Sequence, residues 1–177
     1  MRIAVFPGGF DPVTNGHLDL VRRMTHLFDR VIVAVVRGRD KGNMFTWEER
    51  IDLFRRSVEE LPTVEVEGFN EMTVEFAKRK GAIAIVRGIR AVSDFESEFD
   101  MALMNRKMAP NLESVYLMAN QEFLYISASR IREVSRLGYD VTDLVPAPVG
   151  IAFARKARPA ERGVGGSRPR GAARPDR

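Results

Sequence analysis

Residues 2–36 read RIAVFPGGFDPVTNGHLDLVRRMTHLFDRVIVAVV, and this stretch decides the fold class. Two short apolar runs, residues 2–6 and 30–36, enclose a glycine-rich turn and a stretch whose apolar side chains recur at helical spacing. That apolar helical face consists of Leu20, Val21, Met24, Leu27 and Phe28. A strand, an amphipathic helix and a second strand in this order predict a βαβ unit, whose strands are parallel.

The rest of the chain continues this alternation. Further strands are expected at residues 63–67, 82–86 and 113–118. Further helices are expected from Thr46 to about Glu60, over residues 72–80 before Gly81, from Ser93 to before Pro110, and from Ser127 to near Gly138. Thr46 with Glu49, and Ser93 with Glu96, have the spacing of a capping box. We therefore predict a doubly wound, three-layer α/β sandwich with a mainly parallel five-stranded sheet and helices on both faces.

One domain of residues 1–157 is expected, because 177 residues can form one hydrophobic core but are too few for several. Residues 158–177 are rich in Arg, Pro, Gly, Ala and Ser without apolar periodicity, which predicts a disordered basic tail. The segment from Arg155 onward carries eight Lys or Arg against two acidic residues, so of the net charge of +4 residues 1–154 contribute about −2. Such a body does not favour nucleic-acid binding.

The composition excludes several kinds of site. The chain has no cysteine, which excludes disulfides, thiolate metal sites and cysteine nucleophiles, and its two histidines are too few for a multi-histidine metal site. No run of about 18 apolar residues is present to span a membrane. The apolar N-terminal run reads as a strand and is shorter than a secretory signal, so we expect a cytoplasmic protein with no membrane partner.

The turn after the first strand, Pro7 to His17 (PGGFDPVTNGH), has the outline of a phosphate-binding loop. Adjacent Gly8 and Gly9 let backbone N–H groups approach an anion, and the following helix adds the positive end of its dipole. The turn matches neither the Walker pattern nor the dinucleotide-binding glycine pattern. His17 falls in the first helical turn, where one ring nitrogen could reach a bound phosphate. A capping or surface role is the alternative.

Polar and basic side chains follow the other predicted strands. Lys41 is either a solvated loop charge or a cation that reaches a phosphate. Arg87 and Arg90 flank a short segment after the fourth strand and suit bidentate phosphate binding. The competing interpretation pairs them with acidic side chains of the next helix: Asp94, Glu96 and Glu98. After the fifth strand, Ser127 and Ser129 place hydroxyl groups at a helix N-terminus, and the basic residues behind them could hold triphosphate oxygens.

These groups converge on the carboxyl edge of one sheet, where ligands bind in open α/β folds. No Ser-His-Asp set and no cluster of metal ligands accompanies them. One histidine, several cations and glycine-rich helix starts suit a reaction that depends on positioning and charge neutralisation. Nucleotidyl transfer to a phosphate that is already a nucleophile is such a reaction. No protein metal site is expected, because Mg²⁺ would be held mainly by triphosphate oxygens.

Four segments, in this order, resemble the bacterial phosphopantetheine adenylyltransferases of the nucleotidyltransferase superfamily. They are GGFDPVTNGHLD (Gly8 to Asp19), KGNMFTWEER (Lys41 to Arg50), RGIRAVSDFESE (Arg87 to Glu98) and ISASRIRE (Ile126 to Glu133). The first marks only the superfamily, whereas the third is much more specific to the family. The resemblance covers about residues 2–155. It implies a Rossmann-like nucleotidyltransferase fold, transfer of AMP from ATP to 4′-phosphopantetheine to give dephospho-coenzyme A and pyrophosphate, use of Mg²⁺, and a homohexamer.

The resemblance also assigns roles by position. The catalytic set would comprise His17, Lys41 and Arg90, with His17 stabilising the transition state and Lys41 near the reacting phosphates. The ATP site would comprise Gly9, Phe10, His17, Gly88, Ile89, Arg90, Glu98, Phe123, Leu124, Tyr125, Ile126, Ser127, Ala128 and Ser129. The phosphopantetheine site would comprise Gly9, Lys41, Thr73 and Arg87.

Two positions depart from the family pattern. Family members usually carry Thr or Ser, whose hydroxyl touches the acceptor phosphate, where this chain has Gly9, and a further serine where it has Ala128. Two alternative functions are weighed against the resemblance. A nicotinate or nicotinamide mononucleotide adenylyltransferase shares the glycine-rich turn but lacks the segment Arg87 to Glu98. A non-catalytic nucleic-acid-binding module would use the arginine-rich tail, and the near-neutral body argues against it.

The helix expected from Ser93 carries its own indication of self-association. One apolar face consists of Phe95, Phe99, Ala102 and Leu103, and a second stripe consists of Met101, Met104 and Met108. Helices that are apolar on two faces often have two partners.

Overall fold

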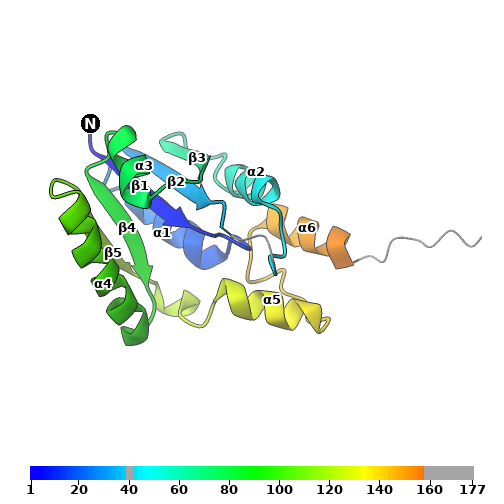
Figure 1. The fold of residues 1–177 in the computed structure, drawn as a ribbon. Coiled ribbons are helices and arrows are strands. Elements are labelled where there is room, and N and C mark those ends of the chain that lie inside the picture. The colour runs from blue at the N-terminus through cyan, green and yellow to red at the C-terminus, as the bar shows by residue number, and fades with distance from the viewer. Residues whose placement is uncertain (39–41, 158–177) are drawn as a thin grey trace, which may run out of the picture.

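The computed structural model describes residues 1–38 and 42–157 (Figure 1). Lys41 and the predicted tail, residues 158–177, lie outside the described residues. The strands are β1 (Ile3–Gly8), β2 (Arg30–Val36), β3 (Val64–Phe69), β4 (Ala84–Ile89) and β5 (Glu113–Met118). The helices are α1 (Asn15–Thr25), α2 (Trp47–Ser57), α3 (Thr73–Arg79), α4 (Val92–Met108), α5 (Ala128–Arg136) and α6 (Ala147–Ala157), with a 3₁₀ turn, η1, at Gln121–Phe123.

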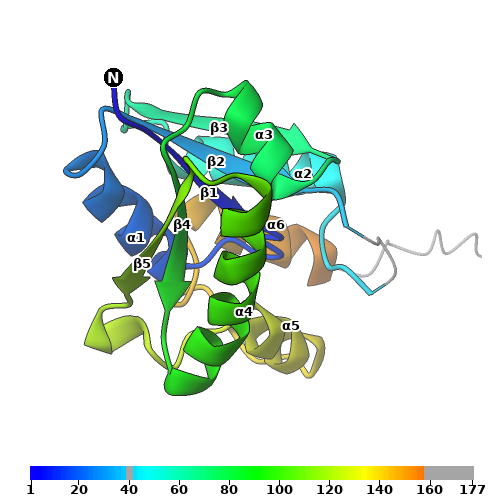
Figure 2. The ribbon, with the colours of Figure 1, turned by 60° about the vertical axis from the view of Figure 1, so that its left-hand side comes forward.

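The five strands form one parallel sheet in the order β3-β2-β1-β4-β5. From the central strand β1 the chain proceeds outward through β2 to β3. It then crosses to the other side of β1 and proceeds through β4 to β5, as Figures 1 and 2 show. This confirms the predicted doubly wound α/β fold. The direction of winding reverses between β1 and β4, and in such sheets a ligand crevice forms there, at the carboxyl ends of the strands.

Two hydrophobic cores lie on the two faces of the sheet. Because successive side chains of a strand point to opposite faces, β1 contributes Ala4 and Phe6 to one core and Val5 to the other. Helices α1, α2, α5 and α6 supply the first core, whereas α3 and the end of α4 supply the second. Figure 2 shows α3 and α4 together on one face. The predicted three-layer arrangement is therefore confirmed.

Helix boundaries follow several of the sequence signals. Thr46 and Glu49 form the predicted capping box: Glu49 N donates to Thr46 Oγ1 at 3.2 Å, and Thr46 N donates to Glu49 Oε2 at 2.8 Å. Gly81 and Gly138, which follow α3 and α5, adopt positive φ angles of 65° and 88°, as helix-terminating glycines do. Leu27, however, is exposed rather than part of the buried face of α1, because that helix already ends at Thr25.

The predicted capping box of Ser93 and Glu96 is wrong. α4 begins at Val92, its N-cap residue is Ala91, and no side chain caps it. The carboxylate that engages the backbone here is Asp94, whose Oδ2 accepts from Arg90 N at 3.1 Å. This contact draws the chain into the helix before Ser93 is reached.

Three strands extend two or three residues beyond their predicted ends, and the extension of β4 bears on the site. Arg87, Gly88 and Ile89 continue β4 instead of forming a loop. They pair with Tyr116, Leu117 and Met118 of β5. The apolar pattern stops at Val86, but ladder hydrogen bonds to the neighbouring strand do not depend on side-chain polarity.

Two helices differ from expectation in what they bury. α6, which the sequence reading did not include, covers the first core with Val149 and Phe153, and the Phe153 ring lies 5.3 Å from that of Phe45. α4 is largely exposed, and Asn105 is its one buried residue. Its expected core face is instead exposed to solvent at Phe95, Phe99 and Leu103, and so are Met101 and Met104. Within residues 1–38 and 42–157, no helix has the length and apolar character needed to cross a membrane.

Gly68 provides a test of the packing between β3 and α2. A Cβ atom at Gly68 would lie 2.3 Å from Trp47 Cζ2 and 2.6 Å from Ile51 Cδ1. The indole cannot retreat freely, because its Nε1 donates to Val35 O at 3.0 Å. We expect Gly68→Ala to lower the free energy of unfolding by roughly 1–3 kcal/mol in urea denaturation.

The matched control is Gly9→Ala, because no heavy atom lies within 4 Å of a Cβ built at Gly9. Its free energy of unfolding should stay within about 0.5 kcal/mol of the wild-type value. Equal losses in the two variants would contradict the packing argument.

Candidate functional site

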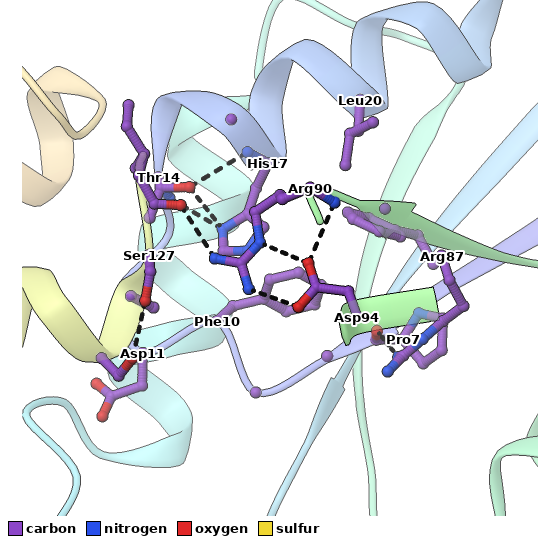
Figure 3. Close-up of a pocket in the computed structure, with 18 of the residues that line it drawn as sticks. Pro7, Phe10, Asp11, Thr14, His17, Leu20, Arg87, Arg90, Asp94 and Ser127 are labelled. Carbon is purple, nitrogen blue, oxygen red and sulfur yellow. Dashed lines mark hydrogen bonds and ion pairs between the residues drawn. The ribbon is translucent and has the colours of Figure 1, made fainter. Parts of the chain in front are cut away.

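A cavity of about 630 Å³ opens where the winding of the sheet reverses. Its wall comes from the turn after β1, the start of α1, the end of β4, the start of α4 and the start of α5. Figure 3 shows residues of these segments facing one another. Segments far apart in the sequence are thus brought together at the carboxyl edge of the sheet, as predicted.

His17 is fixed by the start of α1. Thr14 is the N-cap residue, and its backbone N donates to His17 Nδ1 at 3.1 Å, while His17 N donates to Thr14 Oγ1 at 3.3 Å (Figure 3). Because Nδ1 accepts the hydrogen bond, the proton of the neutral ring is on Nε2. The predicted capping role of His17 is therefore confirmed, and its other ring nitrogen, Nε2, is an N–H donor.

Burial, and to a smaller extent the positive charge of Arg90, together lower the pKa of His17 to about 4. The ring is consequently neutral at pH 7. A neutral imidazole with its proton on Nε2 can donate a hydrogen bond to an anion without carrying a formal charge.

The Phe10 ring packs against the imidazole of His17. Its backbone lies in the left-handed region, with φ of 48°, which is uncommon for a residue with a side chain. Its buried ring meets His17 edge to face at 5.1 Å between centroids and Phe54 at 4.7 Å. Gly8 leaves room for that ring, since a Cβ there would lie 2.7 Å from Phe10 Cζ.

Gly9 presents open space to the cavity. A Cβ at this position would meet no atom within 4 Å, so a side chain with a hydroxyl group would fit. The Gly9 carbonyl accepts from Arg50 Nη1 at 2.7 Å. Arg50 is only 2% exposed and also donates to Val36 O at 3.1 Å and Arg37 O at 2.9 Å. This buried guanidinium joins the turn after β1 to the end of β2.

Arg87 lines the cavity and is paired with Glu98 of α4. Its Nε and Nη2 donate to the two Glu98 carboxylate oxygens at 2.7 and 2.5 Å, and its Nη1 donates to Pro7 O at 2.9 Å. The predicted alternative of an ion pair with the next helix is therefore confirmed for Arg87. An incoming phosphate would share or replace the Glu98 contact.

Arg90 is paired in the same manner. Its Nε lies 3.2 Å from Asp94 Oδ2, and its Nη1 donates to Ile126 O at 3.1 Å, which ties the end of β4 to the start of α5 (Figure 3). Both arginines still line the cavity. Over the described residues the wall carries five arginines against three carboxylates: Arg37, Arg50, Arg87, Arg90 and Arg132 against Asp11, Asp94 and Glu98. This excess of positive charge suits an anionic ligand.

The start of α5 forms the opposite part of the wall. Ser127 is the N-cap residue and accepts from Arg130 N at 3.4 Å, and its hydroxyl lies 2.8 Å from that of Ser129. The other predicted residues placed in the wall are Gly9, Phe10, Gly88, Glu98, Phe123, Ile126 and Ala128.

Some predicted residues lie elsewhere. Leu124 and Tyr125 are exposed, Tyr125 by 71%, and Ile89 is buried in β4. Thr73 begins α3, after the edge strand β3. None of these four lines the cavity as formed by the described residues. Lys41 lies outside the described residues, so its role remains a prediction.

Asp11 and Arg50 are charged wall residues that the sequence did not single out, although both lie within the quoted motif segments. Arg132, one of the basic residues predicted behind Ser129, also lies in the wall. The available signal for Arg50 was a charge on the apolar side of α2, beside the buried Leu53 and Phe54. Such a charge requires partners in a fold, because it is almost never buried unpaired.

Comparison with known proteins agrees with this geometry. Residues 5–134 match the sequence model of the cytidylyltransferase-like family. The chain is 50% identical over 159 residues to a phosphopantetheine adenylyltransferase of Desulfitobacterium hafniense (strain DSM 10664 / DCB-2), covering 90% of this chain and 98% of that protein. The chain belongs to the phosphopantetheine adenylyltransferase family. A phosphopantetheine adenylyltransferase of Desulforudis audaxviator (strain MP104C) is 48% identical to this chain over 149 residues, covering 84% of this chain and 91% of that protein.

A solved structure supports the fold assignment. The bifunctional NMN adenylyltransferase/ADP ribose pyrophosphatase from Francisella tularensis superposes with a TM-score of 0.68 at 17% sequence identity. The match covers 87% of this chain and 49% of that one, so the chain spans about half its length. The predicted resemblance to phosphopantetheine adenylyltransferases and the Rossmann-like nucleotidyltransferase fold are thereby confirmed.

The lowered pKa of His17 has a consequence for stability. The unfolded chain binds a proton at this residue below its ordinary pKa of 6.5, whereas the folded chain does so only below about 4. The free energy of unfolding should therefore fall by roughly 3 kcal/mol on this account as the pH decreases from about 6.5 to 4. Urea denaturation across this pH range measures it.

The control is His17→Gln, because Gln at the third helical position also completes a capping box. The variant should show less loss of stability between pH 6.5 and 4 than the wild type. Parallel pH profiles of the two proteins would contradict the assignment of a neutral, buried His17.

Proposed function

We propose that this chain transfers AMP from ATP to 4′-phosphopantetheine, giving dephospho-coenzyme A and pyrophosphate. The observation that carries this proposal is membership of the phosphopantetheine adenylyltransferase family, with relatives 43–50% identical over 84–90% of the chain. The cavity supports it with a neutral histidine donor and an excess of arginine. Nicotinate or nicotinamide mononucleotide adenylylation and nucleic-acid binding are not favoured, because the relatives bear the name of the first activity.

In the proposed reaction an oxygen of the acceptor phosphate attacks the α-phosphorus of ATP in line with the bond to the β-phosphate. The new P–O bond forms, the α–β anhydride bond breaks, and pyrophosphate leaves. The acceptor phosphate is already anionic, so no general base is needed. His17 Nε2–H would donate to an α-phosphate oxygen, where charge redistributes in the transition state. The Thr14 backbone bond to Nδ1 holds the ring in the required tautomer.

Different arginines would bind different phosphate groups. Arg90 and Arg132, with the hydroxyls of Ser127 and Ser129 at the start of α5, would hold the triphosphate, and Arg87 would hold the acceptor phosphate. The remaining predicted contacts are retained as proposals: Gly9, Phe10, Gly88, Ile89, Glu98 and the segment Phe123 to Ala128 for ATP, and Gly9, Lys41 and Thr73 for phosphopantetheine. Lys41 is proposed to lie near the reacting phosphates.

Mg²⁺ is proposed to enter with ATP. Within residues 1–38 and 42–157, no group of three or more His, Asp or Glu could hold a metal ion. The carboxylates of Asp94 and Glu98 are paired with arginines. A cation carried by triphosphate oxygens fits this wall, since Mg²⁺ often binds through substrate phosphates and water. When bound, it would neutralise triphosphate charge.

Self-association, with a homohexamer as the expected assembly, is supported by α4. This helix exposes six large apolar side chains: Val92, Phe95, Phe99, Met101, Leu103 and Met104. Exposed apolar groups of this size mark interaction surfaces. We further propose that the protein acts in the cytoplasm.

The assignment predicts which acceptor is used. Purified protein incubated with ATP and Mg²⁺ should release pyrophosphate when 4′-phosphopantetheine is added, and dephospho-coenzyme A should accumulate in equal amount. Nicotinate mononucleotide in its place serves as the matched acceptor control and should give background release. Turnover with nicotinate mononucleotide and none with phosphopantetheine would reverse the assignment.

The two cavity residues His17 and Arg90 should differ in their kinetic effects. His17→Ala should lower kcat by roughly 100- to 1,000-fold with a small effect on the KM for ATP, because its donor acts mainly on the transition state. Arg90→Ala should raise the KM for ATP, because a phosphate clamp also holds the ground state. Steady-state kinetics on both variants separates these roles.

His17→Gln serves as the control that preserves the helix cap while removing the imidazole. Its kcat should fall together with that of His17→Ala. If His17→Ala keeps its kcat within about threefold while ATP binding collapses, His17 is a binding residue instead.

A further inference from the structure

Asp11 is a buried acidic residue with every carboxylate oxygen engaged. Asp11 is only 6% exposed to solvent. Oδ2 accepts from Met44 N at 2.8 Å, and Oδ1 accepts from Phe45 N at 2.9 Å. Arg132 Nη1 donates to the Asp11 carbonyl and lies 3.8 Å from Oδ2. Buried carboxylates are retained where such partners compensate their desolvation.

These contacts join three segments that are far apart in the sequence. Asp11 belongs to the turn after β1, Met44 and Phe45 precede α2, and Arg132 belongs to α5. Asn43, next to Met44, and Arg132 both contribute to the cavity wall. The carboxylate of Asp11 itself is directed away from His17 and Arg90 (Figure 3). It therefore determines the shape of one side of the cavity without facing the groups around His17.

Arg132 connects Asp11 to the cavity, because it contacts Asp11 and also lines the wall. Among the residues that the structure describes, Asp11 is the only partner of its guanidinium group, and the bonds use Nη1. Nε and Nη2 donate to none of the described residues. Arg132 follows Ser129 by three residues on α5, a spacing that places both on the same side of a helix, and both line the cavity.

We propose that Asp11 is a positioning residue for the ATP triphosphate: it anchors Arg132 by one nitrogen so that the rest of the guanidinium group faces the phosphates. This rests on the proposed function in naming ATP as the ligand. A long arginine side chain loses considerable conformational freedom when it is fixed. An anchor that fixes it before ATP arrives removes that cost from binding.

The test compares Asp11→Asn, Arg132→Lys and the double variant in steady-state kinetics. Asn keeps the shape of Asp11 but loses the charge, and Lys keeps the charge of Arg132 but cannot donate to Asp11 and a phosphate in the same geometry. Asp11→Asn removes the ion pair with Nη1, and Arg132→Lys removes the guanidinium that donates to the Asp11 carbonyl. Each single variant should raise the KM for ATP about tenfold, because a charged contact that orients the arginine is lost. The double variant should raise it little further, because both changes remove one unit.

Gly68→Ala is the control for a purely structural effect. It destabilises the fold at a residue that does not line the cavity, and its KM for ATP should stay within about twofold of the wild-type value, because loss of folded protein lowers the apparent kcat and not the KM. An unchanged KM for ATP in Asp11→Asn and Arg132→Lys would overturn the proposal. So would additive effects in the double variant. If Asp11→Asn does not fold, an unchanged KM in Arg132→Lys alone overturns it.

Calorimetric titration with ATP keeps this inference apart from the proposed function. If the wild type binds ATP but transfers AMP to no acceptor, the proposed function fails, whereas a weaker Kd in the two single variants still supports the role of Asp11. If all these proteins bind ATP equally, or the wild type does not bind it, the inference about Asp11 fails.

Discussion

The hydrogen bond from the Thr14 backbone to His17 Nδ1 is the constraint on which the cavity depends. A capping box usually carries Glu or Gln at the third helical position. Here a histidine takes that place, so the same contact that starts α1 also assigns the tautomer of the ring. Phe10, forced into the left-handed region, supplies the wall against which the imidazole stands. The contact that caps the helix thus also prepares a hydrogen-bond donor.

Around that donor, the positive charges are held in place by contacts with other protein groups. Arg87 and Arg90 are each paired with a carboxylate of α4, and Arg50 donates to three main-chain carbonyls. Pairing prevents cationic side chains from repelling one another in a confined space, and it reduces the rotamer freedom that ligand binding would otherwise have to remove. The accompanying cost is competition, because Asp94 and Glu98 occupy nitrogens that phosphates would use. Affinity for the anionic ligands is therefore a difference between two sets of ionic contacts.

Much of the fold could be predicted from local signals. The apolar spacing in residues 2–36 predicts the first βαβ unit, and the Thr46–Glu49 pair locates the start of α2. Where the prediction failed, the structure depends on contacts between residues that are far apart in the sequence. β4 extends through Ile89 because β5 is beside it, and Arg50 and Asp11 are buried because their partners come from other segments. The ion pairs of Arg87 and Arg90 were open alternatives, since charge alone does not tell whether a cation pairs with protein or awaits a ligand. The burial of α4 was predicted wrongly for a related reason. Apolar spacing identifies a helix face that is suited to burial, but it does not show whether this chain or another molecule covers that face.

Gly9 has one more consequence, for inhibitors. The space above its Cα is open to the cavity, whereas a family member with Ser or Thr at this position fills it with a side chain. A nucleotide or pantetheine analogue with one added methyl group directed at this spot meets no obstacle in this chain. In the bulkier relative the same methyl collides with a hydroxyl-bearing side chain. The open space at Gly9 thereby gives compounds a basis for selectivity among enzymes that otherwise share the same motifs.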